Sequence, residues 1–400
     1  MKDSERVFKL NGVVQNYSWG GFSFIPDLLG IKNEEEKPFA EYWLGAHANH
    51  SARIEEEKLS DLIEKKPLRY LGAYTQNKFS GLPYLLKILD VRQMLSIQVH
   101  PSIASAQQGF EEENQKGIPL KAPNRNYKDA NHKPEMMIAL DDFWLLHGFK
   151  NERALGKALK SAPELNFLKD LFQNLGYQSL YEAVMHMEQD RVNEILQPLS
   201  LRVLPLYRNG QLEKNDPDFW AARAIESFCS NGQFDRGIFS IYFFNLVHLK
   251  KGQGVFQPAG MPHAYLEGQN VELMSNSDNV LRAGLTEKYI DVPELMKHVQ
   301  FEATEPRILE PMKQGEDFIF PTPAVEFELH QQILKEGKKN KITIITPAIF
   351  LLLEGSLELC DEVKTMRLEK GESVYVLPGT SILMKALLPV NLFYACVPQN

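Results

Sequence analysis

Cysteine is scarce in this chain. Only Cys229, Cys360 and Cys396 occur among 400 residues, they lie far apart, and no two of them form a C-x-x-C pair. This spacing indicates neither a disulfide framework nor a zinc site built on thiolates. We therefore expect a reduced, cytoplasmic, globular protein.

Long apolar runs and an excess of positive charge are also missing. The longest apolar stretch, 238–249, is too short for a membrane helix, and residues 1–6 are too polar for the core of a secretory signal. Lys and Arg number 44 against 52 Asp and Glu, which gives a formal net charge of -8. We therefore expect no membrane and no nucleic acid among the partners, although a local basic cluster would suffice for an anionic small molecule.

Glycine is scarce in one part of the chain only. Between 151 and 230 it occurs three times, and apolar residues recur there at helical spacing. Asp216-Pro217 is typical of a helix start. The sequence before and after this part predicts short strands separated by turns, with strands resuming at 239–244, where aromatic and β-branched residues dominate. The pattern predicts a mainly β protein with a helical insertion.

Two segments of the chain echo each other. Each has a turn glycine, a short strand and a Pro-Gly turn, with eight positions from Gly252 to Gly260 and from Gly371 to Gly379. Three positions beyond the second glycine stand His263 in the first copy and Ile382 in the second. We interpret these as two related β units, one with an imidazole and one without; chance recurrence of such turns is the alternative.

A polar face is predicted on the run 94–99. In a strand, successive side chains point to opposite faces, so Leu95, Ile97 and Val99 would share an apolar face. The opposite face would carry Ser96, Gln98 and His100, polar groups that are costly to bury without partners. A metal ion or a polar ligand would supply those partners.

Two further segments supply potential ligands. Pro134 disfavours a helix at 131–136, so Glu135 is expected to lead the strand 136–140, and a rigid turn delivers His263 onto another strand. Two imidazoles, a carboxylate and an amide oxygen suit zinc, with one position left for water or substrate. The segment 270–288 adds Arg282 and Lys288, two cations fit for phosphate; an ordinary polar loop is the alternative there.

At this point the sequence resembles a known family, the type I mannose-6-phosphate isomerases. The resemblance covers about residues 1 to 300 and rests on several separate motifs. They are Asn-Tyr-Ser-Trp-Gly at 16–20, Ala-Glu-Tyr-Trp-Leu-Gly-Ala-His at 40–47, Leu-Ser-Ile-Gln-Val-His-Pro at 95–101, Asn-His-Lys-Pro-Glu-Met at 131–136, Pro-His-Ala-Tyr at 262–265, and Ser-Asp-Asn-Val-Leu-Arg-Ala-Gly-Leu-Thr at 277–286.

The resemblance implies a fold and a division of the chain. It implies two cupin-type (jelly-roll) β-barrels plus an α-helical domain. We expect a catalytic cupin domain from two parts, a helical insertion between them, and a metal-free cupin-like β domain at the end. The ranges are 1–150 and 235–312 for the catalytic parts, 151–234 for the insertion and 313–400 for the last domain.

The resemblance also implies the site. One zinc ion per chain would be held by Gln98, His100, Glu135 and His263. Arg282 matches the family's active-site arginine and would either anchor phosphate or steady an enediolate. Glu272 would carry the proton with Lys133 assisting, and the substrate would be bound by Ser96, Lys87 and Lys288 together with Arg282. Two departures are Val99, where alanine is usual, and Glu287, where proline is usual before Lys288.

The implied function is the reversible conversion of mannose 6-phosphate into fructose 6-phosphate, with a phosphorylated hexose as partner and the chain a monomer or weak homo-oligomer. The rivals are a non-catalytic phosphosugar-binding cupin and a metal-dependent cupin oxygenase. Oxygenase sites use more histidine and often iron, which speaks against the second. We interpret Trp19 and Trp43 as core aromatics, and His47 and His50 as structural.

Overall fold

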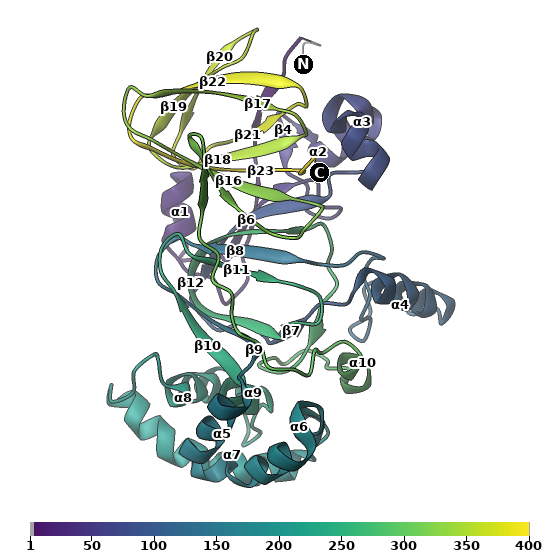
Figure 1. The fold of residues 1–400 in the computed structure, drawn as a ribbon, viewed down its shortest axis with the longest axis vertical. Helices are drawn as coiled ribbons and strands as arrows, with labels where there is room; N and C mark the ends of the chain where they lie inside the picture. Colours follow the sequence, from purple (N-terminus) through teal and green to yellow (C-terminus); the bar gives the residue numbers. More distant parts are fainter. Residues whose placement is uncertain (1–3, 400) are drawn as a thin grey trace.

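A computed structural model describes residues 4–399, and Figure 1 shows three parts arranged along its long axis. A β unit made mainly by the last residues lies at one end, a second β unit occupies the middle, and helices form the other end. The protein is thus mostly sheet with several helices. No helix in residues 4–399 is both long and apolar enough to cross a membrane.

The middle unit is a ten-stranded sheet. Its strands are β2 (Val13–Gln15), β3 (Glu41–Gly45), β6 (Tyr84–Val91), β7 (Gln98–Val99), β8 (Glu135–Ala139), β9 (Phe143–Phe149), β10 (Phe244–Leu249), β11 (Gly254–Gln257), β12 (His263–Ser275) and β13 (Leu281–Arg282). The chain also forms shorter elements outside this sheet: α1 (Phe24–Leu29), the hairpin β4 (Arg53–Ile54) and β5 (Glu57–Lys58), α2 (Leu59–Lys65), α3 (Pro67–Phe79), α4 (Ile103–Gln115) and α10 (Val292–Met296). Of these, β4, α2 and α3 lie beside the last β unit (Figure 1).

Strand β12 pairs with four neighbours. Its first residues lie beside β7 and β9, and its later residues beside β6 and β8. The change of partners coincides with a register shift between Tyr265 and Glu267 and with Gly268, whose φ is 130°. A Cβ at Gly268 would lie 2.6 Å from the Asp142 carbonyl oxygen, so this bend needs glycine.

The helical part contains α5 (Glu152–Ser161), the 3-10 turn η1 (Pro163–Leu165), α6 (Phe167–Met185), α7 (Gln189–Arg208), α8 (Pro217–Phe228) and α9 (Gly237–Phe243). The Asp216 side chain caps α8 at the start predicted from the sequence, accepting from the Asp218 amide. Helix α9 corrects the prediction of a strand at 239–244, since only Phe244 begins one. Its side chains are buried all round, so they show no helical periodicity.

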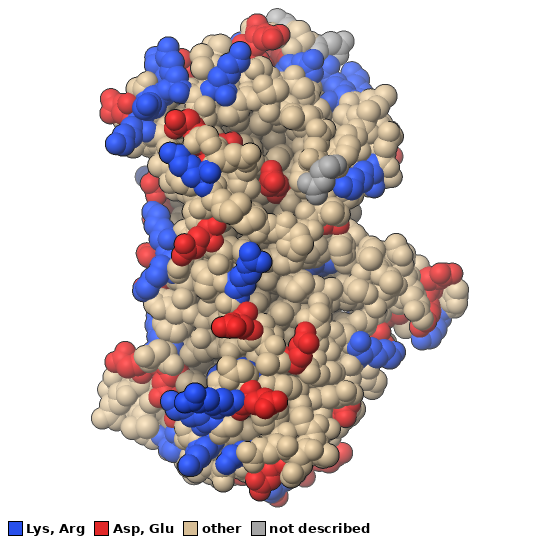
Figure 2. Space-filling model, in the orientation of Figure 1, with Lys and Arg blue, Asp and Glu red and all other residues tan. Residues whose placement is uncertain are grey.

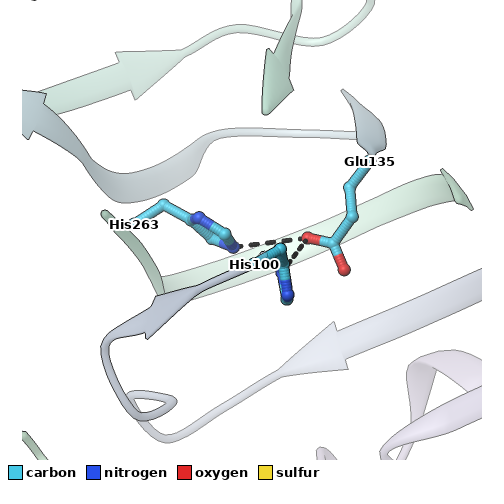
Figure 3. A group of neighbouring side chains, drawn as sticks. All are labelled: His100, Glu135 and His263. Carbon is cyan, nitrogen blue, oxygen red and sulfur yellow. Dashed lines mark ion pairs between the residues drawn. The ribbon is translucent and has the colours of Figure 1, made fainter. Parts of the chain in front are cut away.

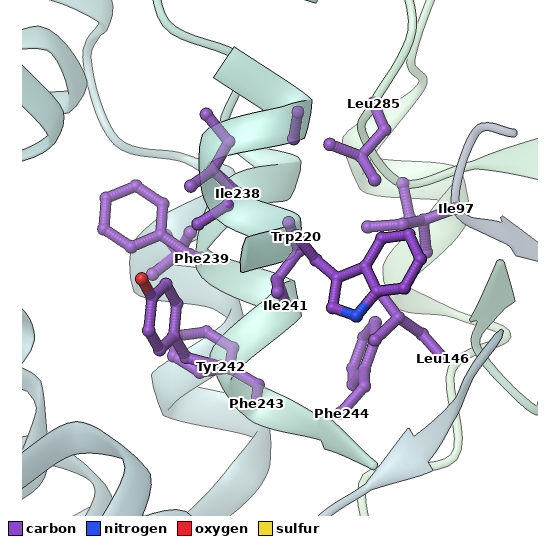
Figure 4. Close-up of a cluster of buried hydrophobic side chains, with 14 of the residues drawn as sticks. Ile97, Leu146, Trp220, Ile238, Phe239, Ile241, Tyr242, Phe243, Phe244 and Leu285 are labelled. Atoms are coloured by element: carbon purple, nitrogen blue, oxygen red, sulfur yellow. The ribbon is translucent and has the colours of Figure 1, made fainter. Parts of the chain in front are cut away.

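The helices pack on the β unit through one apolar cluster. Figure 4 shows Trp220 of α8 among Leu146 of β9, Ile97 and residues of α9. Ile97 and Val99 belong to this cluster, as predicted, but Leu95 packs on a different one and lines the cavity described below. Regular pairing covers only Gln98–Val99 of the predicted strand 94–99.

The remaining β unit has a seven-stranded and a four-stranded sheet. The first contains β1 (Val7–Leu10), β14 (Met312–Gln314), β15 (Asp317–Phe320), β16 (Glu328–Leu334), β18 (Ala348–Glu354), β21 (Ser373–Val376) and β23 (Val390–Cys396). The second contains β17 (Lys339–Ile344), β19 (Ser356–Cys360), β20 (Thr365–Glu369) and β22 (Thr380–Ala386). They pack face to face on a shared apolar core, and β1 brings the start of the chain into this unit.

The two echoing segments have matching backbones. Gly252 and Gly260 have φ of 84° and 82°, and Gly371 and Gly379 have φ of 84° and 73°. Ile382, at the place of His263, is fully buried in the apolar core of its unit. The glycines of the two turns therefore share a left-handed conformation, while the relation between the two β units stays a prediction.

Charges are mixed over the surface. On the face shown in Figure 2, the Lys and Arg side chains alternate with Asp and Glu, without one large patch of a single sign. Such a surface agrees with the mild net charge of the chain. The absence of nucleic-acid partners stays a prediction.

Lys150, at the junction of β9 and α5, yields a pH prediction. Burial lowers the pKa of its ammonium to about 7, and Nζ donates to the Phe244 carbonyl oxygen. The unfolded chain, with a lysine pKa of about 10.4, binds more protons between pH 7 and 10, so the free energy of unfolding rises with pH in that window. In Lys150→Met the increase in the free energy of unfolding from pH 7 to pH 10 should be smaller than in wild type by about 1–3 kcal/mol. This figure is lower than the full pKa difference implies because Lys150 is partly exposed to solvent.

Urea denaturation at pH 7 and pH 10 measures the change, and Lys160→Met, on the exposed side of α5, is the control. An unaltered pH dependence in Lys150→Met would contradict the assignment.

Candidate metal centre and active site

Two imidazoles and a carboxylate meet inside the middle β unit. His100, Glu135 and His263 place one ligand atom each within 4.8 Å of one another, and all three are buried. Glu135 Oε2 lies 3.4 Å from His100 Nε2 and 3.3 Å from His263 Nε2, as the dashed lines in Figure 3 show. They come from the ends of three segments far apart in the sequence, and the structure brings them together as the sequence predicts.

The second ring nitrogen of each histidine, Nδ1, faces a backbone carbonyl oxygen. His100 Nδ1 lies 2.8 Å from the Asn279 oxygen, and His263 Nδ1 lies 2.9 Å from the Met261 oxygen. A neutral imidazole that donates through Nδ1 has its lone pair on Nε2, the atom that faces Glu135. His100 Nε2 is buried and has no hydrogen-bond partner. The residues therefore fit a metal ion, which would satisfy that atom.

The electrostatics keep His100 and Glu135 in their ligating forms. Burial lowers the pKa of His100 to about 4, despite the opposing effect of Glu135. Burial raises the pKa of the Glu135 carboxyl, but Lys133 and the imidazoles outweigh it and hold this pKa well below its usual range. Lys133 Nζ lies 2.8 Å from Glu135 Oε1. At neutral pH His100 is thus a neutral imidazole and Glu135 a carboxylate, the forms that zinc binds.

Gln98 connects this cluster to Arg282. On the paired strands His263 lies opposite Gln98, and Gln98 lies opposite Arg282. Side chains directly opposite each other share a face, so the three form a row across β12, β7 and β13. Gln98 lines a cavity of 60 Å³ that also borders Glu135 and His263, which is the position expected of a fourth ligand.

A larger cavity opens beside the small one. It has a volume of 520 Å³, and Gln98 and Glu41 line both cavities. The predicted residues Ser96, Arg282 and Lys288 line the larger one. Burial lowers the pKa of the Arg282 guanidinium, and within residues 4–399 neither Arg282 nor Lys288 has a carboxylate in ion-pair contact. Two cations without acidic partners suit an anionic group.

The predicted residues Lys87, Lys133 and Glu272 lie deeper, in the small cavity. Lys87 Nζ lies 3.1 Å from Glu272 Oε2 and 3.4 Å from Glu41 Oε2. Lys87 points into the small cavity because side chains alternate along β6, and its neighbours Leu86 and Ile88 pack on the opposite face of the strand. Burial lowers the pKa of Lys87, but the carboxylates outweigh it and raise the pKa above its usual value. Both lysines are thus held in ion pairs away from the larger cavity.

Comparison with known proteins decides the family. A family model for the catalytic domain of type I phosphomannose isomerase matches residues 7–152. Mannose-6-phosphate isomerase of Escherichia coli (strain K12) is 35% identical over 391 residues, covering 93% of this chain and 95% of that protein. The chain belongs to the type I phosphomannose isomerase family.

Other relatives support the same assignment. Mannose-6-phosphate isomerase of Homo sapiens is 31% identical over 98% of both chains. The crystal structure of the Salmonella typhimurium enzyme, described as bound to substrate (f6p) and metal atom (zn), superposes with a TM-score of 0.87 at 33% identity. It covers 99% of this chain and 100% of that one.

Three residues of this phosphomannose isomerase site were missed or misjudged from the sequence. Trp19 was predicted to be a core aromatic. It does pack, half-buried, against an apolar cluster, but it also lines the larger cavity, where its ring stacks on Tyr17 with centroids 5.9 Å apart. Tyr265 donates to Glu272 Oε1 at 2.8 Å, and Glu41 receives the Trp43 indole N–H. All three residues lie in the family motifs at 16–20, 40–47 and 262–265, which is the sequence signal that could have assigned them to the site.

Trp43, His47 and Glu287 were also assessed from the sequence, and the structure agrees with the roles expected of the first two. Trp43 is buried, as predicted, and its ring lies 4.9 Å from Lys87 Nζ. His47 hydrogen-bonds Asp278 at 3.1 Å, in agreement with a structural role. Glu287 is exposed on the rim beside Lys288, without an ion pair to it among the described residues. The departure at this position therefore leaves Lys288 available.

Removing one imidazole tests the metal centre. In His100→Ala the zinc affinity should fall at least about 100-fold, because a directly bound nitrogen is lost, while the fold is kept. Isothermal titration of metal-free protein with Zn²⁺ measures it. His248→Ala is the control, since His248 stacks on Trp144 and pairs with Asp142 outside the cluster. Equal affinity in His100→Ala and wild type would contradict the assignment.

Proposed function

We propose that this chain interconverts D-mannose 6-phosphate and D-fructose 6-phosphate, with one zinc ion per chain held by Gln98, His100, Glu135 and His263. The observation that carries the proposal is the row His263, Gln98, Arg282. It joins a buried set of nitrogen and oxygen donors to a guanidinium that has no ion-pair partner within residues 4–399, across two neighbouring cavities that share lining residues. The family membership supports the same activity.

The larger cavity has the features needed to hold a phosphorylated hexose. Arg282 presents a planar fork of N–H donors to a phosphate, and Lys288 adds a second positive charge at the rim. The Trp19 ring gives an apolar face for the sugar, and Ser96 offers a hydroxyl. This location favours phosphate anchoring as the role of Arg282. The sugar's reacting end would then extend toward Gln98.

The chemical step moves a proton between C2 and C1. A base removes the C2 proton of the aldose, giving an enediol-type intermediate, and returns a proton to C1 while the hydroxyl proton passes from O2 to O1. Zinc, when bound, supplies positive charge that stabilises negative charge developing on the sugar oxygens. Glu272 is the proposed proton carrier: burial raises the pKa of its carboxyl, which favours proton uptake.

The neighbours of Glu272 hold it for this task. Lys87 donates to Oε2 at 3.1 Å and Tyr265 donates to Oε1 at 2.8 Å, so the carboxylate is fixed from both sides. Lys133, on the other side of the same small cavity, neutralises Glu135 and assists with its ammonium protons. The small volume of 60 Å³ excludes most water from the proton's path.

The finer architecture is also a proposal. We propose that both β units are cupin-type barrels and that the chain divides into 1–150, 151–234, 235–312 and 313–400. Face-to-face packing of two sheets in the last unit and the echo of glycine turns support it. Strand β1 pairs with β21 and helix α9 packs with the helices, so two short segments cross these limits.

A coupled assay tests the function. Fructose 6-phosphate should form from mannose 6-phosphate, the activity should disappear after treatment with a chelator, and Zn²⁺ should restore it. Binding of mannose 6-phosphate by the zinc-loaded protein without conversion would favour the non-catalytic rival. Stoichiometric iron with oxygen consumption would favour the oxygenase.

Glu272→Gln separates proton transfer from metal binding. The exchange of the C2 proton and the turnover should both fall at least about 100-fold, because an amide cannot carry the proton, while the zinc content stays unchanged. Exchange of deuterium at C2, followed by NMR, measures it. Glu267→Gln is a matched control on the same strand, since Glu267 pairs with Lys214 and Arg223 outside the cavities. Exchange at the wild-type rate would remove Glu272 from this role.

Arg282→Met tests the phosphate anchor. The kcat/KM for mannose 6-phosphate should fall about 100-fold, because hydrogen bonds to a charged group are lost, whereas any turnover of unphosphorylated mannose should change little. Steady-state kinetics with both sugars gives the ratio, and Arg153→Met, at an exposed position of α5, is the control. An equal loss with both sugars would point instead to a role in stabilising the enediolate.

A further inference from the structure

A second group of metal-binding side chains lies in the other β unit, on β16 and β23. Glu328 and His330 stand two residues apart on β16, and Cys396 of β23 lies directly opposite Glu328 in the register. Residues two apart on a strand, and residues opposite each other on neighbours, share one face. Regular pairing therefore places a carboxylate, an imidazole and a thiol side by side.

The three side chains are close enough to share an ion. Glu328, His330 and Cys396 offer one ligand atom each within 4.8 Å of one another. His330 Nε2 lies 2.6 Å from Glu328 Oε1, and His330 is buried, with 8% of its surface exposed. Glu328 retains 35% exposure of its side chain and borders a cavity of 420 Å³, which gives an ion access from solvent.

A carboxylate lies behind the imidazole. His330 Nδ1 is 3.7 Å from Asp317 Oδ2, and both Nδ1 and Asp317 Oδ1 are buried without a hydrogen-bond partner. The Tyr394 hydroxyl donates to Asp317 Oδ2 at 2.7 Å, and its ring stacks on His330 with centroids 4.4 Å apart. Metal-bound histidines typically direct their second nitrogen to such a carboxylate.

We propose that Glu328, His330 and Cys396 form a second metal site, with Asp317 orienting His330. The ligand types are a thiolate, an imidazole and a carboxylate, which suit zinc or a similar divalent transition ion and not Mg²⁺ or Ca²⁺. Binding releases the proton of the Cys396 thiol, and the proton on His330 Nε2 that bridges to Glu328 also leaves. Water fills the remaining position. The site joins β16 to β23 at the end of the sheet.

Cobalt distinguishes this site from the catalytic one. The proposed catalytic ligands include no sulfur, so a thiolate-to-cobalt charge-transfer band can arise only from a cysteine. The probe is Co²⁺ added to the full-length protein already loaded with one equivalent of Zn²⁺. Wild type should bind one further ion per chain and show the band. If the charge-transfer band is absent in wild type at saturating Co²⁺, His330 and Glu328 form only an ion pair and the proposal is overturned.

Two variants and a matched control locate the band. Cys396→Ser should lose it, and His330→Gln should bind Co²⁺ at least about tenfold more weakly. Cys360→Ser is the control, because Cys360 also ends a strand of this unit but hydrogen-bonds only the Asp361 carbonyl among the described residues. A band that survives in Cys396→Ser would overturn the proposal, whichever cysteine then carries it. Circular dichroism checks that each variant is folded.

Discussion

The bent strand β12 is the constraint on which the site depends. It pairs with four strands, and its bend at Gly268 allows one half to lie beside β7 and the other beside β6 and β8. His263 is on the first half, opposite Gln98; Glu272 is on the second, opposite Lys87. A shift by one residue in either half would turn these side chains to the other face of the sheet. The same strand thus places a proposed metal ligand and the proposed proton carrier in one cavity.

Charge balance in the small cavity explains why a cation belongs there. Glu41, Glu135 and Glu272 face Lys87 and Lys133, so the buried carboxylates outnumber the buried ammonium groups by one. Buried charges are tolerated when they are paired and hydrogen-bonded, and each of these carboxylates has such a partner. The neutral imidazole of His100 and the amide of Gln98 leave the excess negative charge for a divalent ion to offset. In the proposed function, an anionic substrate meets Arg282 in the adjoining cavity.

Much of the catalytic site could be predicted because its residues lie in short motifs with fixed backbone chemistry. Pro134 sets an extended approach to Glu135, and the turn before His263 needs its glycine, so local sequence places each donor on a strand. Local periodicity could not place Trp19, because a tryptophan side chain is typical of the core, whereas this one also lines the larger cavity. It also failed at 239–244, where burial on every side of α9 erased the helical pattern.

The proposed second metal site was even less predictable from the sequence. The sequence indicated no thiolate site because Cys396 is 66 residues from His330, and only the β16–β23 register makes them neighbours. The expectation of a metal-free last domain rested on Ile382, which marks the place of His263, whereas Glu328 and Cys396 use other strands. Pairing between distant strands is a property of the fold, and spacing along the chain does not reveal it.

The most direct test of the central claim is the position of zinc in a crystal of the zinc-loaded protein, located by anomalous scattering at the zinc edge. The account predicts an ion in the middle β unit, about 2.0–2.2 Å from His100 Nε2, His263 Nε2, a Glu135 oxygen and the Gln98 oxygen. A fully occupied zinc-loaded crystal in which the ion avoids either imidazole, or in which Gln98 points away from it, would contradict the claim that β12 and β7 together build the metal centre.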